Sequence, residues 1–184
     1  MIDKQVSGNL LNHIRSKVVA GFDPATMFVE NKDLPNALQL VHKGFYIGIL
    51  SSTNEEVIRE GFLKEDLQNV LESANIVIEN VIRRLKQKSI PLSQIHTSSF
   101  HLTIVSDVVY IQNPTHWDEN KDGVYFQWGQ NYKALYLPYQ IKRMNIPKIE
   151  IMDRLCGWEA GLAANLWRKP EGLVWKMTCF AYPD

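Results

Sequence analysis

The amino-acid sequence predicts an α+β fold in which helices pack on a mainly antiparallel sheet. One long segment, residues 64–86, carries apolar residues at the 3.6-residue spacing of an amphipathic helix. Other segments are rich in β-branched and aromatic residues and are separated by short turns that contain Gly, Asn or Pro. Because strands are mixed with separate helices, this pattern favours the α+β class.

The N-terminal part begins with a predicted helix over residues 6–19, which has apolar residues at helical spacing. A loop is expected over residues 22–35, which contain two Pro residues. Residues 37–42 and 45–50 are rich in β-formers. We expect them to form a hairpin through Lys43-Gly44.

The helix expected over residues 64–86 carries a continuous apolar stripe. Its C-terminal end is basic, which suits the negative end of the helix dipole. We interpret these cations as a solvated helix end, with a phosphate-binding patch as the alternative. They are Arg83, Arg84, Lys86 and Lys88.

The C-terminal part is predicted to hold most of the sheet. Residues 101–111 form a long β-rich stretch, and residues 123–129 and 133–138 form a second hairpin. Residues 147–159 start with Pro and read as a helix, which Ala160-Gly161 would end. Residues 173–182 are the last predicted strand.

Length and composition are typical of one globular domain, spanning residues 1–184. Of the 184 residues, 45% are hydrophobic and 22% are charged, which excludes a disordered chain. Twenty Lys and Arg balance 20 Asp and Glu. The zero net charge argues against an indiscriminate nucleic-acid binder, because such proteins neutralise phosphates with an excess of cations.

Three features lead us to expect a cytoplasmic protein that does not enter the membrane. The first residues include Asp3 and Lys4 and lack the apolar core of a secretory signal. The longest mainly apolar run, Phe45–Leu50, is too short to span a bilayer. The cysteines, Cys156 and Cys179, show no CxxC pattern, so neither a disulfide scaffold nor a thiolate zinc site is expected.

No metal or cofactor is predicted. Asp118, Asn120, Asp122 and Gly123 match the first half of an EF-hand calcium loop, but Gly129 stands where that loop needs a bidentate Glu. We interpret the segment as a polar hairpin turn. The glycine-rich phosphate loops and the HExxH zinc helix are absent from the sequence, and the five scattered histidines are interpreted as isolated side chains.

Cys156 is the candidate nucleophile, but its setting is unfavourable. It lies near the C-terminal end of the helix predicted over residues 147–159, where the helix dipole disfavours a thiolate. It also belongs to the apolar face of that helix. We therefore favour a buried, inert thiol, and the same holds for Cys179. The five tryptophans and seven tyrosines could line a groove for a small molecule or peptide, with core packing as the alternative for most of them.

Several motifs in the last third of the chain occur in a recognisable order. They are the turn Asp122–Tyr125, the strand Lys133–Pro138, the helix end Ile151–Leu162 and Trp167. In this order they resemble the family of the AMME chromosomal region (AMMECR), which shows a glycine-containing turn, an "ALxLP" strand, a helix ending in "LCxKAGL" and a following Trp. The strong match covers about residues 106–175.

The resemblance implies an α+β fold with two unequal subdomains and a cleft between them. The chain departs from the family at two places. The family's "LRGCIG" motif is reduced to Ile47-Gly48, and Tyr46 stands where the family has Cys. Glu159 stands where the family has Lys. Any activity that depends on the family's thiol is therefore expected to be absent or changed.

The first functional hypothesis is a metal-free enzyme, or an enzyme subunit, acting on a small molecule in that cleft within a biosynthetic or modification pathway. Tyr46 would orient or protonate the substrate, and Glu159 would act as a base or bind a cation. Cys156 is the third candidate catalytic residue. The ligand-binding candidates, drawn from the polar run after the first glycine-containing strand and from the end of the Leu-Pro strand, are Gly48, Ser51, Thr53 and Tyr139.

The second hypothesis is a non-catalytic scaffold that docks a partner enzyme through Trp117, Trp128 and Trp158. Members of the family in bacteria and archaea often accompany a Memo-like protein and a radical S-adenosylmethionine enzyme, so the resemblance implies one of these as a partner. RNA binding or modification is a third alternative, which the neutral charge disfavours. A homodimer also stays open.

Overall fold

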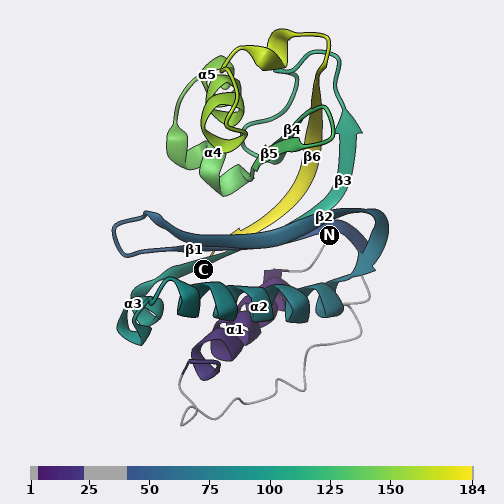
Figure 1. The fold of residues 1–184 in the computed structure, drawn as a ribbon. Coiled ribbons are helices and arrows are strands. Elements are labelled where there is room, and N and C mark those ends of the chain that lie inside the picture. The colour runs from purple at the N-terminus through teal and green to yellow at the C-terminus, as the bar shows by residue number, and fades with distance from the viewer. Residues whose placement is uncertain (1–3, 23–40, 184) are drawn as a thin grey trace. The chain divides into compact units, whose positions relative to one another are not determined.

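The computed structural model describes residues 4–22 and 41–183 (Figure 1). They fall into two compact units. The first contains the described residues up to Ile104 together with those from Ala181 onward, and the second is Val105–Phe180. Strand β3 (Ser99–Tyr110) and strand β6 (Gly172–Pro183) each contribute residues to both units. Helices and antiparallel strand pairs together confirm the predicted α+β class.

In the first unit, helices pack on three strands. The strand order is β2-β1-β3, and β1 pairs antiparallel with β2. Besides part of β3, the elements in chain order are α1 (Lys4–Ala20), β1 (Val41–Leu50), β2 (Glu56–Asn69), α2 (Val70–Gln87) and α3 (Leu92–Thr97).

Figure 1 shows α1 and α2 on one side of the first unit's strands, and the buried side chains of these elements form its core. Alternate residues of β1 point into it, namely Phe45, Ile47 and Ile49. The stripe of α2 packs on them, and most of its predicted apolar positions are buried. Two predicted positions are exposed, namely Leu71 in the first turn of α2 and Leu67, which lies in β2. This burial supplies most of the stability of α2, because helices in water are marginal without tertiary packing.

Helix α2 starts later than the sequence predicts. Asn69 caps it, and the Asn69 side chain accepts hydrogen bonds from the amides of Leu71 (2.9 Å) and Glu72 (3.3 Å). Residues 64–69, predicted to be helical, belong instead to the end of β2. In the register of the two strands, His42 opposes Gln68 and Gly44 opposes Leu63. Between these two pairs β2 therefore has more residues than β1. Pairing with β1 thus overrides the local helical preference.

The first predicted hairpin is placed wrongly. Residues 41–50 form one strand through Lys43-Gly44, and the turn lies at residues 51–55 between β1 and β2. The register shift beside Gly44 shows that this glycine lies in a strand irregularity rather than a turn. Residues 37–40 of the predicted hairpin and most of the predicted loop over 22–35 lie outside the described residues.

The second unit has the strand order β3-β6-β4-β5, and β4 pairs antiparallel with both neighbours. The second predicted hairpin, the helix and the last strand all appear close to their expected bounds. The further elements are β4 (Asp122–Trp128), β5 (Tyr132–Tyr136), α4 (Pro138–Met144), α5 (Lys148–Arg154), a π-helical turn (Leu155–Glu159) and a 3₁₀ turn (Leu166–Arg168).

A separate apolar core holds the second unit together. One face of β4 and β6 supplies Val124, Phe126 and Val174, and the helical side supplies Met152 and Leu155, among others. Figure 1 shows α4 and α5 gathered on one side of these strands. Within the described part of the chain, no helix has both the length and the apolar character that a membrane crossing requires.

Candidate functional site

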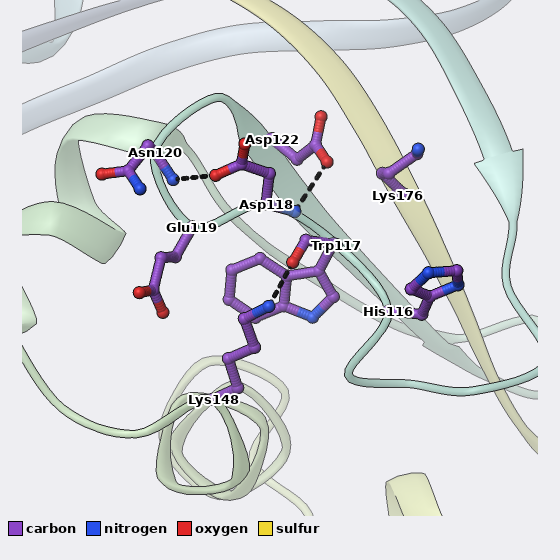
Figure 2. Close-up of a pocket in the computed structure, with 8 residues that line it drawn as sticks. All are labelled: His116, Trp117, Asp118, Glu119, Asn120, Asp122, Lys148 and Lys176. Atoms are coloured by element: carbon purple, nitrogen blue, oxygen red, sulfur yellow. Dashed lines mark hydrogen bonds between the residues drawn. The ribbon is translucent and has the colours of Figure 1, made fainter.

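A pocket of about 470 Å³ opens in the second unit beside the loop that leads into β4 (Figure 2). The loop supplies most of its wall, the first residue of α5 supplies Lys148, and β6 supplies Lys176. The pocket therefore combines residues that are far apart in the sequence. The lining residues are His116, Trp117, Asp118, Glu119, Asn120, Asp122, Lys148 and Lys176.

Two aspartates shape the loop. The Asp122 carboxylate accepts a hydrogen bond from the backbone amide of Asp118 (2.8 Å), and the Asp118 carboxylate accepts one from the backbone amide of Asn120 (2.9 Å). Short polar side chains favour turns by bonding to the backbone in this way. The structure thus agrees with the interpretation of this segment as a polar turn. In the described part of the chain, no three His, Cys, Asp or Glu side chains are grouped to hold a metal ion.

The ionised form of Asp118 is stabilised by its surroundings. The pKa of its carboxyl is lowered, first by the hydrogen bond from the Asn120 backbone and then by the positive charges of Lys121 and Lys148, while partial desolvation opposes the shift. Lys121 lies 3.9 Å from the carboxylate. At neutral pH the pocket therefore keeps a fixed negative charge at this position.

Lys148 fastens the start of α5 to the loop. Its ammonium donates hydrogen bonds to the backbone carbonyls of Trp117 and of Thr115, the latter at 3.4 Å. It also lies 5.1 Å from the centre of the Trp117 ring. The Trp117 indole is turned inward, is only 4% exposed and donates to the carbonyl of Pro114 (3.0 Å). These contacts give the pocket a rigid floor.

Three charged or polar side chains of the pocket are uncommitted among the residues that the structure describes. Glu119, His116 and Lys176 line the pocket, but their side chains make no hydrogen bond or ion pair with the described residues. Lys176 is half-buried, whereas Glu119 and His116 are exposed. A half-buried ammonium without a partner loses hydration without compensation, so these groups are the ones that a ligand would engage.

A second hollow of about 390 Å³ adjoins this pocket. Glu119 and Asn120 line both, so the tip of the loop separates them. The helical side supplies Ile141, Ile146 and Ile151 to its wall, together with the polar Lys142 and Asn145. The loop tip is therefore in contact with two adjacent hollows.

The sequence-predicted site residues of the first unit lie on β1 and in the turn that follows it. Tyr46 and Gly48 point to the face of β1 opposite the core, by the alternation of the strand. Tyr46 is 6% exposed and its ring lies over Gly61 of β2. The hydroxyls of Ser51 and Thr53 are hydrogen-bonded to each other (2.8 Å) and shape the turn.

The predicted residues of the second unit occupy three settings. Tyr139 is buried in α4, and Glu159 is exposed at the end of the π-helical turn. Cys156 is fully buried in the same turn, and burial raises the pKa of its thiol to about 11, so it is protonated at neutral pH. This favours the interpretation of Cys156 as an inert core thiol. The cleft that would bring these residues to Tyr46 stays a prediction.

Sequence reasoning did not identify the pocket, although it noticed part of its wall. The spacing of Asp118, Asn120 and Asp122 stood out and was correctly interpreted as a turn. Nothing in the sequence links this turn to Lys148 or Lys176, which approach it only through the packing of α5 and β6. The available signal was a polar loop without Gly-rich phosphate motifs, which is too general to indicate a site.

Comparison with known proteins shows a shared fold and no family. No family model matches the chain, and no curated protein matches it. A crystal structure of an uncharacterized protein from Pyrococcus horikoshii superimposes with a TM-score of 0.77. The two chains are 17% identical over 100% of this chain and 93% of the archaeal one. This likeness shows a shared fold.

Proposed function

We propose that this protein is an AMMECR-like enzyme or enzyme subunit that acts on a small polar molecule bound in the pocket between the 116–122 loop, α5 and β6. The single observation that carries the proposal is the pocket itself, with its rigid floor and uncommitted charged groups. Its volume of about 470 Å³ is within the roughly 300–1,000 Å³ usual for ligand sites. The order of motifs in the last third of the chain supports the family assignment.

The pocket suits binding and orientation of a polar ligand. Asp118 carries a carboxylate whose ionisation is favoured, and Lys176 offers an ammonium that pairs with none of the described residues. Tyr46 and Glu159, which do not line this pocket, stay the candidate catalytic residues in acid–base roles, and Cys156 would join them only if its buried thiol became exposed. The partner enzyme in a biosynthetic or modification pathway would be a Memo-like or a radical S-adenosylmethionine protein.

Native mass spectrometry of the purified full chain, compared with its denatured mass, tests the pocket. We expect a non-covalent adduct of a few hundred daltons. Substitution of Asn120 by Trp would fill the loop tip and should remove the adduct, whereas Asn131→Trp, in the exposed β4–β5 turn, should leave it. Retention of the adduct by a folded Asn120→Trp protein would show that the ligand binds elsewhere. Absence of any adduct, together with no response to a fragment screen by NMR, would contradict the proposal.

The catalytic assignment has its own test. Tyr46→Phe and Glu159→Gln remove one hydroxyl and one charge with little change in volume. We expect each to reduce the yield of the pathway at unchanged protein level, by roughly the hundredfold typical of a lost acid–base group. Full yield from both variants would exclude the assignment.

One residue, Trp158, supports the scaffold hypothesis. Trp158 is 74% exposed, and the guanidinium of Arg154 lies 4.7 Å from the centre of its ring. Exposed tryptophans are common interaction hot spots. Trp117 cannot serve as the predicted docking anchor because it is buried, and Trp128 is half-buried against the second core. Loss of a co-purifying partner in Trp158→Ala, with the adduct retained, would favour the scaffold role.

A further inference from the structure

We infer that the ligand of the pocket is a small dipolar molecule with an ammonium group at one end and a carboxylate or similar anion at the other. This inference rests on the proposed function and names the chemistry of its ligand. It follows from which charges of the pocket are already neutralised, which remain available, and where these lie.

Most charges of the pocket already have partners. Asp122 accepts from the Asp118 amide, Asp118 accepts from the Asn120 amide and lies near Lys121, and Lys148 donates to two backbone carbonyls. These groups hold the loop and the helix together. A ligand that competed for them would have to break contacts within the protein, which costs the free energy of each lost hydrogen bond.

The available groups have opposite signs and are separated. Lys176 and Glu119 both line the pocket and make no ion pair within the described residues. In Figure 2 they lie on opposite sides of Trp117, with His116 on the side of Lys176. They are too far apart to neutralise each other directly, as the missing ion pair shows. A ligand with two opposite charges would satisfy both at once.

The remaining charges of the pocket disfavour other ligand classes. Three carboxylates, those of Asp118, Glu119 and Asp122, would repel a ligand rich in phosphate. A dicarboxylate would place its second anion beside Glu119, and a diamine would place its second cation beside Lys176. A metal ion alone would lack a set of three acidic, His or Cys ligands among the described residues. The dipolar ligand is the class in which each charged end meets an available group of opposite charge.

A matched set of linear probes tests the inference. The ω-amino acids β-alanine, γ-aminobutyrate and ε-aminocaproate differ only in length, while putrescine and succinate carry two like charges. Each is titrated into the labelled full-length protein, and binding is followed by two-dimensional NMR through the indole N–H signal of Trp117 and the amide signal of Asn120. We expect at least one ω-amino acid to bind roughly tenfold tighter than putrescine and succinate, a ratio set by one lost charged contact.

Charge variants then separate recognition from folding. Lys176→Gln should weaken binding of the preferred ω-amino acid by about tenfold or more, and Lys133→Gln, on the exposed part of β5, should leave it unchanged. Glu119→Lys changes an exposed side chain and should not disturb the fold. It should reverse the preference so that succinate binds best, which a purely structural role of Glu119 would not produce.

Two outcomes overturn the inference. One is that succinate or putrescine binds the unmodified protein as tightly as every ω-amino acid. The other is that no ω-amino acid shifts the Trp117 and Asn120 signals. In either case a native-mass adduct that disappears in Asn120→Trp would leave the proposed function standing, so the two failures are distinguishable.

Discussion

At the scale of single residues, His42 shows how burial fixes a protonation state. Its side chain is 1% exposed, its Nε2 lies 2.9 Å from the Ser73 hydroxyl, and the rings of Phe45 and Phe62 pack around it. Burial lowers the pKa of His42 below its ordinary value of 6.5, and hydrogen bonds to the backbone of Asn69 and Gly44 only partly oppose this. The folded protein therefore holds a neutral imidazole.

This burial predicts acid sensitivity of the first unit. Below about pH 6.5 the unfolded chain binds a proton at His42 that the folded chain resists, so the free energy of unfolding falls as the pH decreases toward the folded pKa. Above about pH 6.5 the stabilisation that comes from His42 is fully present, because the imidazole is then neutral in both states. In urea unfolding, wild type should lose up to about 1.4 kcal/mol per pH unit more than His42→Gln over this window. Exposed His96→Gln is the control, and parallel pH profiles of wild type and His42→Gln would contradict the prediction.

At the scale of elements, the β1–β2 pair depends on a glycine at one cross-strand position. Gly61 opposes Tyr46, and a Cβ atom added to Gly61 would lie 2.3 Å from the Phe45 carbonyl oxygen and 2.3 Å from a Tyr46 ring carbon. The carbonyl belongs to the strand and cannot move aside cheaply. The aromatic ring therefore covers the glycine, which leaves no room for a side chain.

Gly61→Ala is accordingly expected to destabilise the protein by about 1–3 kcal/mol, the usual range for overpacking. Gly8→Ala is a matched control, for which we expect an increase in stability. Gly8 lies in α1 with nothing within 4 Å of an added Cβ, so alanine there should stabilise by about 0.8–1 kcal/mol through helix propensity. Both changes are measured by chemical denaturation. An unchanged or higher stability of Gly61→Ala would show that Tyr46 moves away from Gly61 at little cost.

The same elements show where local patterns predict structure and where they fail. The stripe of α2 and the β4–β5 hairpin were predicted well, because helical periodicity and a short polar turn are encoded within a few residues. The start of α2 and the first hairpin were wrong. In both cases the pairing of β1 with a distant part of β2 decides the outcome, and a local window contains no information about that pairing.

At the scale of the whole molecule, the two cysteines report on the second unit. Cys156 and Cys179 both lie within Val105–Phe180, and burial raises the pKa of their thiols to about 11 and about 12. Thiolates are the reactive species, so the native protein should resist a thiol reagent at neutral pH. Because the unfolded thiols ionise near the ordinary value of 9.0, the free energy of unfolding should also fall as the pH rises above about 9.

Labelling of Cys156→Ala and Cys179→Ala, each of which keeps one thiol, measures the opening of this unit. We expect the labelling of each remaining thiol to accelerate with urea in step with the loss of structure. If either thiol is labelled rapidly in the absence of urea, the second unit exposes its core in the native state, and Cys156 would regain its place as a nucleophile candidate.

The likeness to the archaeal structure belongs to this scale as well. A TM-score of 0.77 at 17% identity means that the two chains share a fold while most side chains differ. Many sequences with the same pattern of buried positions can adopt one architecture, because cores tolerate substitutions that preserve volume and patterning. A shared fold does not transfer a function, which must be argued from the site.

By itself the sequence determined the α+β class, the two helical stripes, the second hairpin, the polar turn at Asp118–Asp122 and the burial of Cys156. All of these depend on spacing within short segments, where the periods of helix and strand are directly visible. Only the tertiary structure decided the β1–β2 register, the late start of α2 and the pocket. Glu119, Lys148 and Lys176 are distant in sequence, and packing alone brings a loop, a helix start and a strand to one site.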